Sequence, residues 1–278
     1  MVKYKSEIID FNVCDQIDNV HMTEIMNTEW MPTAGPFSLC DLIVKGCFPH
    51  VRSLTFGGHW VDAVLMKGIS QNISLSSLSI NYTQFADELS KDSLLMFFRE
   101  ARNLEQLELA VCSSDHMDDD VLAELAAHSR ITSLSICCCG NVTEKSLLAI
   151  ARACPLQHLH IGDKTLTSVE AVLPIVRACR DTIVSLRLPF ADLEDPEACE
   201  ILDLCSGSPI EHLWLGAQLL TSKTFAKIAE KKYQSLKTLN LENSFLSRGE
   251  ANQIMSSCPK LARRNFVYTE IPPYLTVT

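Results

Sequence analysis

The chain has 278 residues, 47% of them hydrophobic, and a formal net charge of −10. This length and composition allow a large buried core, and no run of about 18 apolar residues predicts a membrane span. Binding to nucleic acid needs clustered Lys and Arg that displace counterions from phosphates, and an acidic chain is poorly suited to it. We therefore expect a protein partner, with no nucleic acid and no membrane.

The N-terminus and the cysteines bear on the compartment. The first residues, MVKYKSEIIDFN, have neither the apolar stretch of a secretory signal nor the Arg-rich, acid-poor character of a transit peptide. The twelve cysteines follow a repeat period, so we expect them to be reduced rather than paired in disulfides. These features predict a protein of the cytoplasm, the nucleus or both.

Residues 1–50 keep no regular period, although the apolar spacing over 8–13 is a candidate for a degenerate first strand. Pro32 and Pro36 then break the chain. The simplest interpretation is a cap, because the end of a repeat stack must be shielded from water.

From residue 51 onward, an apolar pattern φ-x-x-φ-x-φ, in which φ is an apolar residue, recurs every 24 to 29 residues. Each copy predicts a short strand, because alternate side chains of a strand face the same side. The copies begin at Val51, Leu75, Leu104, Ile131, Leu156, Ile183, Ile210 and Leu236, and the pattern fades at Leu261. The period predicts an α/β leucine-rich-repeat solenoid, a horseshoe with a parallel concave sheet and convex helices. We expect about eight to nine repeats over residues 51–268, followed by a tail at 269–278.

A second pattern, apolar at i, i+3, i+4 and i+7, lies between the strands and predicts a short helix in each repeat. Residues able to cap these helices are Thr143, Thr167, Asp195, Thr221 and Ser247. Pro196 fits a first helical position, where no backbone hydrogen bond is lost. Pro174 falls inside its segment, so we expect it to kink or shorten that helix.

Most cysteines have a structural interpretation. Small apolar side chains seal the helix ends in one column, which contains Cys154, Cys179, Cys205 and Cys258. The run Cys137-Cys138-Cys139 lacks a second pair at zinc-site spacing, and Cys137 is expected to be its most exposed member. The consecutive acids at 118–120 lack the spacing of a calcium loop and are interpreted as a helix start, where the helix dipole favours acids.

The stretch SLSICCCGNVTEKSLLAIARACPLQHLHIGDKTLTSVEAVLPIVRAC resembles the cysteine-containing class of leucine-rich repeats. That class has a strand, a Cys, a Thr-led helix and an ending Cys-Pro-x-Leu, here Cys154-Pro155-Leu156 and again Cys258-Pro259-Lys260-Leu261. Other copies depart from the pattern, since Arg180 follows Cys179 and Lys232 stands where the Cys is expected. The resemblance covers about residues 51–266 and implies the fold more specifically than the function.

Well-known members of this class are F-box/LRR substrate receptors of cullin-based, SCF-like ubiquitin ligases, which place an F-box before the repeats. The Leu-Pro opening and the Cys-x-x-Trp-like ending of an F-box are not recognisable in residues 1–50. A second family of ligase receptors places a Ser-Leu-led elongin-binding helix there, and Ser38-Leu39 resembles its start, with Ile43 where a Cys is expected. The resemblance implies a substrate-recognition subunit that binds a cullin adaptor through residues 1–50. The alternative is a scaffold or assembly factor that binds protein without ubiquitin transfer.

Sequence motifs of catalysis are absent. The chain has no GxSxG elbow, no phosphate-cradling glycine loop, no HExxH and no nucleophile with an identifiable base. We therefore predict no enzymatic activity, no catalytic residue, no cofactor and no metal site.

Residues flanking the second and third apolar positions of each strand point onto the predicted concave face. In the first repeats they are small and polar, whereas later repeats carry larger side chains. The residues expected to bind a protein are His158, His160, Arg187, His212, Trp214 and Asn240. Trp and Arg are enriched among the few residues that dominate interface energies. The alternatives are packing of these side chains against one another without a partner, and a metal site, which the charge of Arg187 among the histidines disfavours.

Overall fold

A computed structural model describes residues 2–3, 19–23, 50–57, 60–61, 63–70, 74–81, 84–85, 90–110, 117–127, 130–139, 141–162, 166, 168–189, 193–216 and 220–270. The chain divides into two compact units, Met1–Cys154 and Pro155–Thr278. The candidate strand at 8–13 lies outside the described residues. The division into a cap, a repeat domain and a tail remains a prediction.

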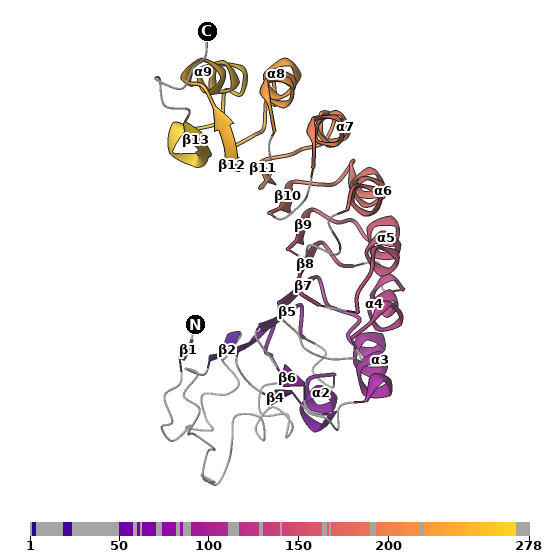
Figure 1. Cartoon of the computed structure of the whole chain (residues 1–278). Helices are drawn as coiled ribbons and strands as arrows, with labels where there is room; N and C mark the ends of the chain where they lie inside the picture. Colours follow the sequence, from indigo (N-terminus) through magenta and orange to yellow (C-terminus); the bar gives the residue numbers. More distant parts are fainter. Residues whose placement is uncertain are drawn as a thin grey trace. The chain divides into compact units, whose positions relative to one another are not determined.

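The first unit alternates strands and helices, and its strands are parallel in the order β1-β2-β3-β5-β7-β8 (Figure 1). Short strands β4 and β6 form a separate parallel pair. The strands are β1 (Val2–Lys3), β2 (Asn19–Thr23), β3 (Ser53–Gly57), β4 (Trp60–Val61), β5 (Ser77–Asn81), β6 (Gln84–Phe85), β7 (Gln106–Ala110) and β8 (Ser133–Cys137). The helices are α2 (Ala63–Ser70), α3 (Lys91–Glu100), α4 (Asp119–Ala126) and α5 (Glu144–Ala153).

The second unit repeats the same alternation, with parallel strands in the order β9-β10-β11-β12-β13. The strands are β9 (His158–Ile161), β10 (Ser185–Leu188), β11 (His212–Leu215), β12 (Thr238–Leu246) and β13 (Phe266–Glu270). The helices are α6 (Val169–Cys179), α7 (Asp195–Cys205), α8 (Ser222–Lys231), α9 (Arg248–Ser257) and the 3-10 turn η2 (Arg263–Asn265). The α-helices cover one face of this sheet and leave the other face, here called the open face, uncovered (Figure 1).

The predicted apolar positions form ladders across each sheet. In the second unit the register pairs Leu159 with Leu186, Leu186 with Leu213 and Leu213 with Leu239, and these side chains are at most 2% exposed. Burial of each such side chain stabilises the fold by about 1.5–3 kcal/mol. Parallel strands that stack in register, each followed by a helix, confirm the predicted α/β leucine-rich-repeat solenoid.

Several predicted helix starts are confirmed, because the side chains of Thr143, Thr221 and Ser247 accept hydrogen bonds from the first turns of α5, α8 and α9. Two were misplaced by one residue. Glu194 caps α7, so that Asp195 is the first helical residue, and Ser168 caps α6. The expected shortening at Pro174 is wrong, since α6 continues through it to eleven residues.

A carboxylate at one helix start also binds the start of the next helix. Asp195 Oδ1 accepts hydrogen bonds from Thr221 N at 2.9 Å and Thr224 Oγ1 at 2.6 Å, and Asp119 binds the start of α5 in the same way in the first unit. Burial opposes ionisation of Asp195, but the hydrogen bonds from the two threonines outweigh it and lower the pKa of the carboxyl. This aspartate clasp connects successive repeats through polar contacts.

The cysteine column is confirmed as part of the packing. Cys154, Cys179, Cys205 and Cys258 are at most 6% exposed, and burial raises the pKa of the Cys179 thiol to about 11 and of the Cys205 thiol to about 12. Such side chains serve the core rather than chemistry.

In the repeat without this cysteine, the next residue takes over the packing. Lys232 is exposed and ends α8 with a left-handed backbone at φ 50°, which directs the chain so that Tyr233 becomes buried. The Tyr233 hydroxyl donates a hydrogen bond to the Leu202 carbonyl at 2.7 Å. The aromatic ring thus fills the place of the missing cysteine.

Two expectations about exposed and terminal residues were wrong. Cys138, rather than Cys137, is the exposed member of its run, because strand β8 ends at Cys137 and Cys138 turns outward with φ 54°. The fading signature at Leu261 was also misread. Residues 263–265 form a 3-10 turn, and the register pairs Leu239 with Phe266, so the last strand begins two residues later than the signature indicated.

Candidate functional site

The predicted site residues lie side by side on the open face of the second unit. The register pairs His160 with Arg187, Arg187 with Trp214 and Trp214 with Asn240 on four neighbouring strands. A second row runs from His158 through Ser185 to His212. Neighbouring strands are about 4.8 Å apart, so the two rows form one continuous surface. We call His158, His160, Arg187, His212, Trp214 and Asn240 the polar patch.

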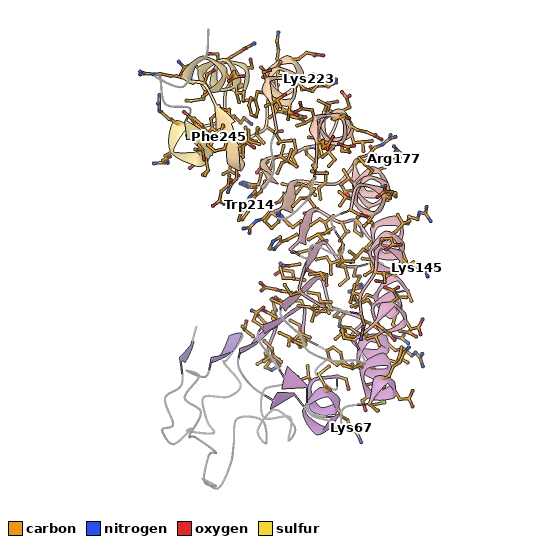
Figure 2. The ribbon with its side chains drawn as sticks, viewed as in Figure 1. Lys67, Lys145, Arg177, Trp214, Lys223 and Phe245 are labelled. Atoms are coloured by element: carbon orange, nitrogen blue, oxygen red, sulfur yellow. The ribbon has the colours of Figure 1, made fainter. Side chains whose placement is uncertain are left out.

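Trp214 and Arg187 form the centre of the polar patch. The Arg187 guanidinium carbon lies 4.6 Å from the centroid of the indole, in cation–π geometry. Trp214 extends from the side of the sheet that the helices leave uncovered, whereas Arg177 and Lys223 extend from the helices (Figure 2). Arg187 remains exposed and Trp214 is half-buried, so a cation and part of a large aromatic side chain are presented together.

The indole is held in place by a glycine. A Cβ atom added to Gly216 would lie 2.2 Å from Trp214 Nε1 and 3.1 Å from the Pro189 Cα atom, so only glycine allows this position of the ring. Nε1 is buried, and it has no hydrogen-bond acceptor within the described part of the chain. Leaving a buried donor without an acceptor costs about 1–3 kcal/mol.

His212 is fixed by its neighbours. Its Nδ1 atom shares a hydrogen bond with Thr238 Oγ1 at 2.8 Å, and its Nε2 atom lies 3.9 Å from Glu211 Oε2. The Glu211 carboxylate also accepts a hydrogen bond from Lys237 Nζ at 2.6 Å, which lowers the pKa of that carboxyl. The acid next to the polar patch is therefore already balanced by a lysine.

The open face continues beyond the predicted site to two apolar residues that the sequence did not reveal. The register pairs Asn240 with Val267 and Phe245 with Thr269 on β12 and β13. Phe245 is 55% exposed and Val267 is 46% exposed. Val267 and Thr269 are two residues apart on β13, so their side chains point to the same side of the sheet. Asn240, Phe245, Val267 and Thr269 therefore share the open face. We call Phe245 and Val267 the apolar corner.

Val267 could have been found if the last strand had been aligned on Phe266 and Tyr268 instead of Leu261. Phe245 gave no signal, because a register shift between Leu241 and Phe245 interrupts the repeat pattern. Gly216 directly follows a strand that carries Trp214, but its contact with the indole depends on the conformation of the side chain.

In the first unit, the open face is the side of the sheet opposite helices α3, α4 and α5, and its side chains are different (Figure 1). Its rows, Ser53-Ser77-Gln106-Ser133 and Thr55-Ser79-Glu108-Ser135, are in the predicted register. Ser79 Oγ donates a hydrogen bond to Glu108 Oε2 at 2.7 Å and accepts one from Asn81 Nδ2 at 2.7 Å. Three polar side chains of this part of the sheet thus bond to one another.

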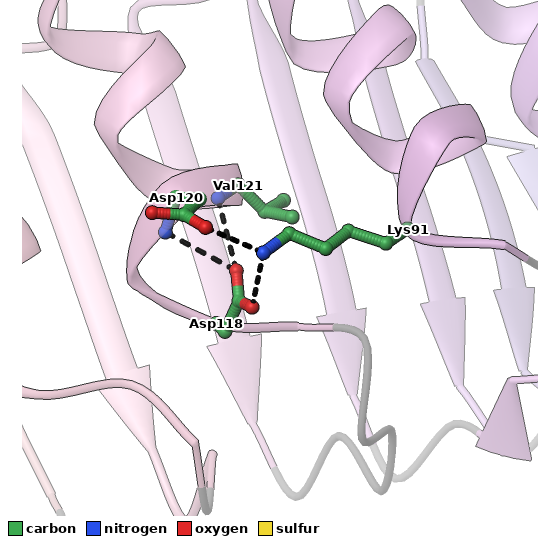
Figure 3. A network of polar contacts seen from close by, with 4 residues as sticks. All are labelled: Lys91, Asp118, Asp120 and Val121. Carbon is green, nitrogen blue, oxygen red and sulfur yellow. Dashed lines mark hydrogen bonds and ion pairs between the residues drawn. The ribbon is translucent and has the colours of Figure 1, made fainter.

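The acidic run at 118–120 begins helix α4, as predicted (Figure 3). Asp118 Oδ1 accepts hydrogen bonds from the backbone of Asp120 and Val121 at the start of α4. Lys91 Nζ lies 2.7 Å from Asp118 Oδ2 and 2.5 Å from Asp120 Oδ2. A lysine therefore supplies the positive charge between these two carboxylates.

Three further observations concern other types of site. Among the described residues, no group of three His, Cys, Asp or Glu side chains is placed to hold a metal ion. A hollow of about 770 Å³ lies in the first unit, at the C-terminal ends of α2, α3 and α4. Two of its arginines form hydrogen bonds within its wall, Arg99 to Glu124 at 2.8 Å and Arg130 to Asn103 at 3.0 Å.

Among the described helices, none has the length and apolar character needed to cross a bilayer.

The repeated strand and helix, the apolar ladders and the buried cysteine column define the class of fold, a leucine-rich-repeat solenoid. The chain is 29% identical over 72 residues to F-box/LRR-repeat protein 15 of Rattus norvegicus, which covers 26% of this chain and 24% of that protein. It is 28% identical over 71 residues to F-box/LRR-repeat protein 15 of Mus musculus, with the same coverage. The matches thus span about a quarter of the length of these relatives, and they confirm the resemblance predicted from the cysteine pattern.

No family model matches the chain. Among solved structures, an internalin from Listeria monocytogenes superposes with a TM-score of 0.46 and 13% identity, over 74% of this chain and 51% of that chain.

Proposed function

We propose that this chain is a non-catalytic protein-binding module that holds its partner on the open face of the second unit. The stacked pair of Arg187 and Trp214 is the observation that carries the proposal. Interfaces depend on a few Trp, Tyr and Arg residues surrounded by contacts that exclude water. The pair lies at the centre of a surface of larger side chains, where such an arrangement is expected.

The specific role that we propose is substrate recognition in a cullin-based ubiquitin ligase. The similarity to F-box/LRR-repeat protein 15 supports it. In this role the polar patch binds the substrate, and residues 1–50 bind a cullin adaptor, in the cytoplasm or the nucleus. This assignment rests on resemblance, and fold alone does not define function.

A scaffold or assembly factor is the second candidate. It is favoured by the sequence of residues 1–50, in which the F-box opening and ending are not recognisable, and by the lack of a matching family model. The scaffold uses the same open face but has no need of a cullin adaptor.

Affinity purification of three full-length forms from cells separates the two roles. They are the natural chain, an N-terminal variant Leu39→Ser and an open-face variant Arg187→Ala/Trp214→Ala, with circular dichroism to check that each folds. A ligase receptor retains its substrate but loses cullin in the N-terminal variant, and loses its substrate but retains cullin in the open-face variant. Recovery of a partner without cullin in the natural chain contradicts the receptor role. A partner retained by the open-face variant contradicts the proposed binding surface.

A further inference from the structure

We infer that the partner, bound as proposed above, presents a segment in which acidic side chains adjoin an exposed aliphatic or aromatic side chain. The inference rests on the proposed function and specifies the chemistry of its partner. Two independent observations carry it, the charge of the polar patch and the exposure of the apolar corner.

The charge of the polar patch is the first observation. Its registered rows contain Arg187 and the three histidines but no acidic residue, although the whole chain carries a net charge of −10. No carboxylate among the described residues lies within ion-pair distance of Arg187, and Trp214 is its ring partner. A cation left without an acid on an otherwise acidic protein selects an acidic ligand, because interfaces bring opposite potentials together.

Two acids among the described residues lie close in sequence to the paired rows and do not cancel this charge. Glu211 is held by Lys237 at 2.6 Å, and Glu242 lies on β12 at the register shift, beyond the paired rows. On strands β3, β5, β7 and β8 of the first unit, the rows carry Glu108, which is hydrogen-bonded to Ser79, and no Lys or Arg. An acidic segment is therefore favoured on the second unit over these four strands of the first.

The apolar corner is the second observation. The large hydrophobic side chains that are exposed among the described residues are Met96, at 40%, Phe245, at 55%, and Val267, at 46%. Val267 on β13 is in register with Asn240 at the end of the polar patch, and Phe245 on β12 pairs with Thr269, two residues further along β13. Contact of these side chains with water is unfavourable. Covering them with a partner's apolar group contributes about 25 cal/mol of binding free energy for each Å² of apolar surface buried.

The distance between the two areas sets the length of the segment. Arg187 and Val267 occupy the same row and are separated by the strands that carry Trp214 and Asn240. Three strand spacings of about 4.8 Å give roughly 14 Å. An extended chain covers this with about four residues at about 3.3 Å each. The segment thus carries its acidic and apolar groups about three to five residues apart.

The test is the selection of random dodecapeptides, displayed on phage, by the immobilised full-length protein. We expect enrichment of sequences with Asp or Glu about three to five residues from Leu, Ile, Phe or Trp. In synthetic form, such a peptide should lose about tenfold or more in affinity to Arg187→Glu and to Val267→Ser/Phe245→Ser. Gln106→Ala, in the first unit, is the matched control and should leave the affinity unchanged.

A charge exchange makes the test specific. The peptide in which Lys replaces the acid should bind Arg187→Glu better than it binds the natural protein. Peptides that depend on Trp214 but show no preference for acids overturn this inference and leave the proposed function intact. Peptides whose binding no open-face substitution affects overturn both, and so does a selection that enriches no peptide.

Discussion

The open faces of the two units differ in how their polar groups are satisfied. In the first unit, Ser79, Asn81 and Glu108 bond to one another. In the second unit, Arg187 lies over an aromatic ring and Trp214 Nε1 has no acceptor within the described residues. The strands under the two faces pair in the same parallel, in-register way. The difference between them therefore lies in side chains that the fold does not require, which supports our proposal that the partner binds the second unit.

The largest expected effect is the loss of partner affinity when Trp214, at the centre of the polar patch, is removed. Trp214→Ala should reduce the affinity for the cellular partner by about thirtyfold or more, as for a residue at the centre of an interface. Gln106→Ala, at a large polar position of the first unit, should have no effect. Calorimetric titration of both variants measures the difference, and equal losses in the two contradict the assignment of the site to the second unit.

Gly216→Ala tests whether binding to the second unit depends on the position of the Trp214 ring, because it removes no binding side chain. The added methyl collides with Trp214 Nε1, so the indole must leave its position beneath Arg187. We expect a shift in tryptophan fluorescence and a loss of partner affinity of about tenfold, since interface residues act through a fixed geometry. Unchanged binding with a displaced ring would show that the stacked arrangement is not the form that binds.

Both units contain an aspartate clasp, and its contribution to stability can be measured in each. Asp195→Ala removes the acceptor for Thr224, whose side chain is 0% exposed, and should lower the free energy of unfolding by about 1–3 kcal/mol. Asp119→Ala should have a similar effect in the first unit, because Asp119 accepts from Ser146 in the same way. Urea denaturation measures both values. A large loss in only one variant contradicts the equivalence of the two clasps.

The clasp also predicts how stability depends on pH. Burial opposes ionisation of Asp119 and Asp195, but hydrogen bonds outweigh it and lower the pKa of both carboxyls. Their contribution is fully present above the ordinary pKa of Asp, about 3.9, and is lost as the pH falls through the lowered values. Denaturation midpoints at successive pH values should therefore fall less steeply in acid for the Asp195→Ala variant than for the natural chain.

The smallest effect is expected at the ion pairs of the first unit. Lys91→Met removes partly exposed contacts to Asp118 and Asp120, so the melting temperature should fall slightly and the difference should shrink in salt. Binding of the partner should not change. A loss of binding would place a functional surface on the first unit and weaken the comparison between the two.

Much of this structure could be predicted from the sequence because the repeat makes its register explicit. Apolar residues at fixed spacing define the ladders, and the residues between them define the open-face rows, so the neighbours of Arg187 followed directly. The prediction failed where the period is broken. The 3-10 turn at 263–265 moves the last strand by two residues, which hid Val267. Contacts that depend on side-chain conformation, such as the indole against Gly216, leave no periodic signal.

Photo-crosslinking at two matched serines tests the central claim most directly. Ser185 and Ser133 occupy equivalent open-face positions in the second and first units. A photoreactive residue placed at either position in the full-length protein reports which face the partner touches in cells. We predict crosslinks to the partner from position 185 that disappear with Arg187→Glu, and none from position 133. Crosslinks to the same partner from position 133 alone would contradict the account.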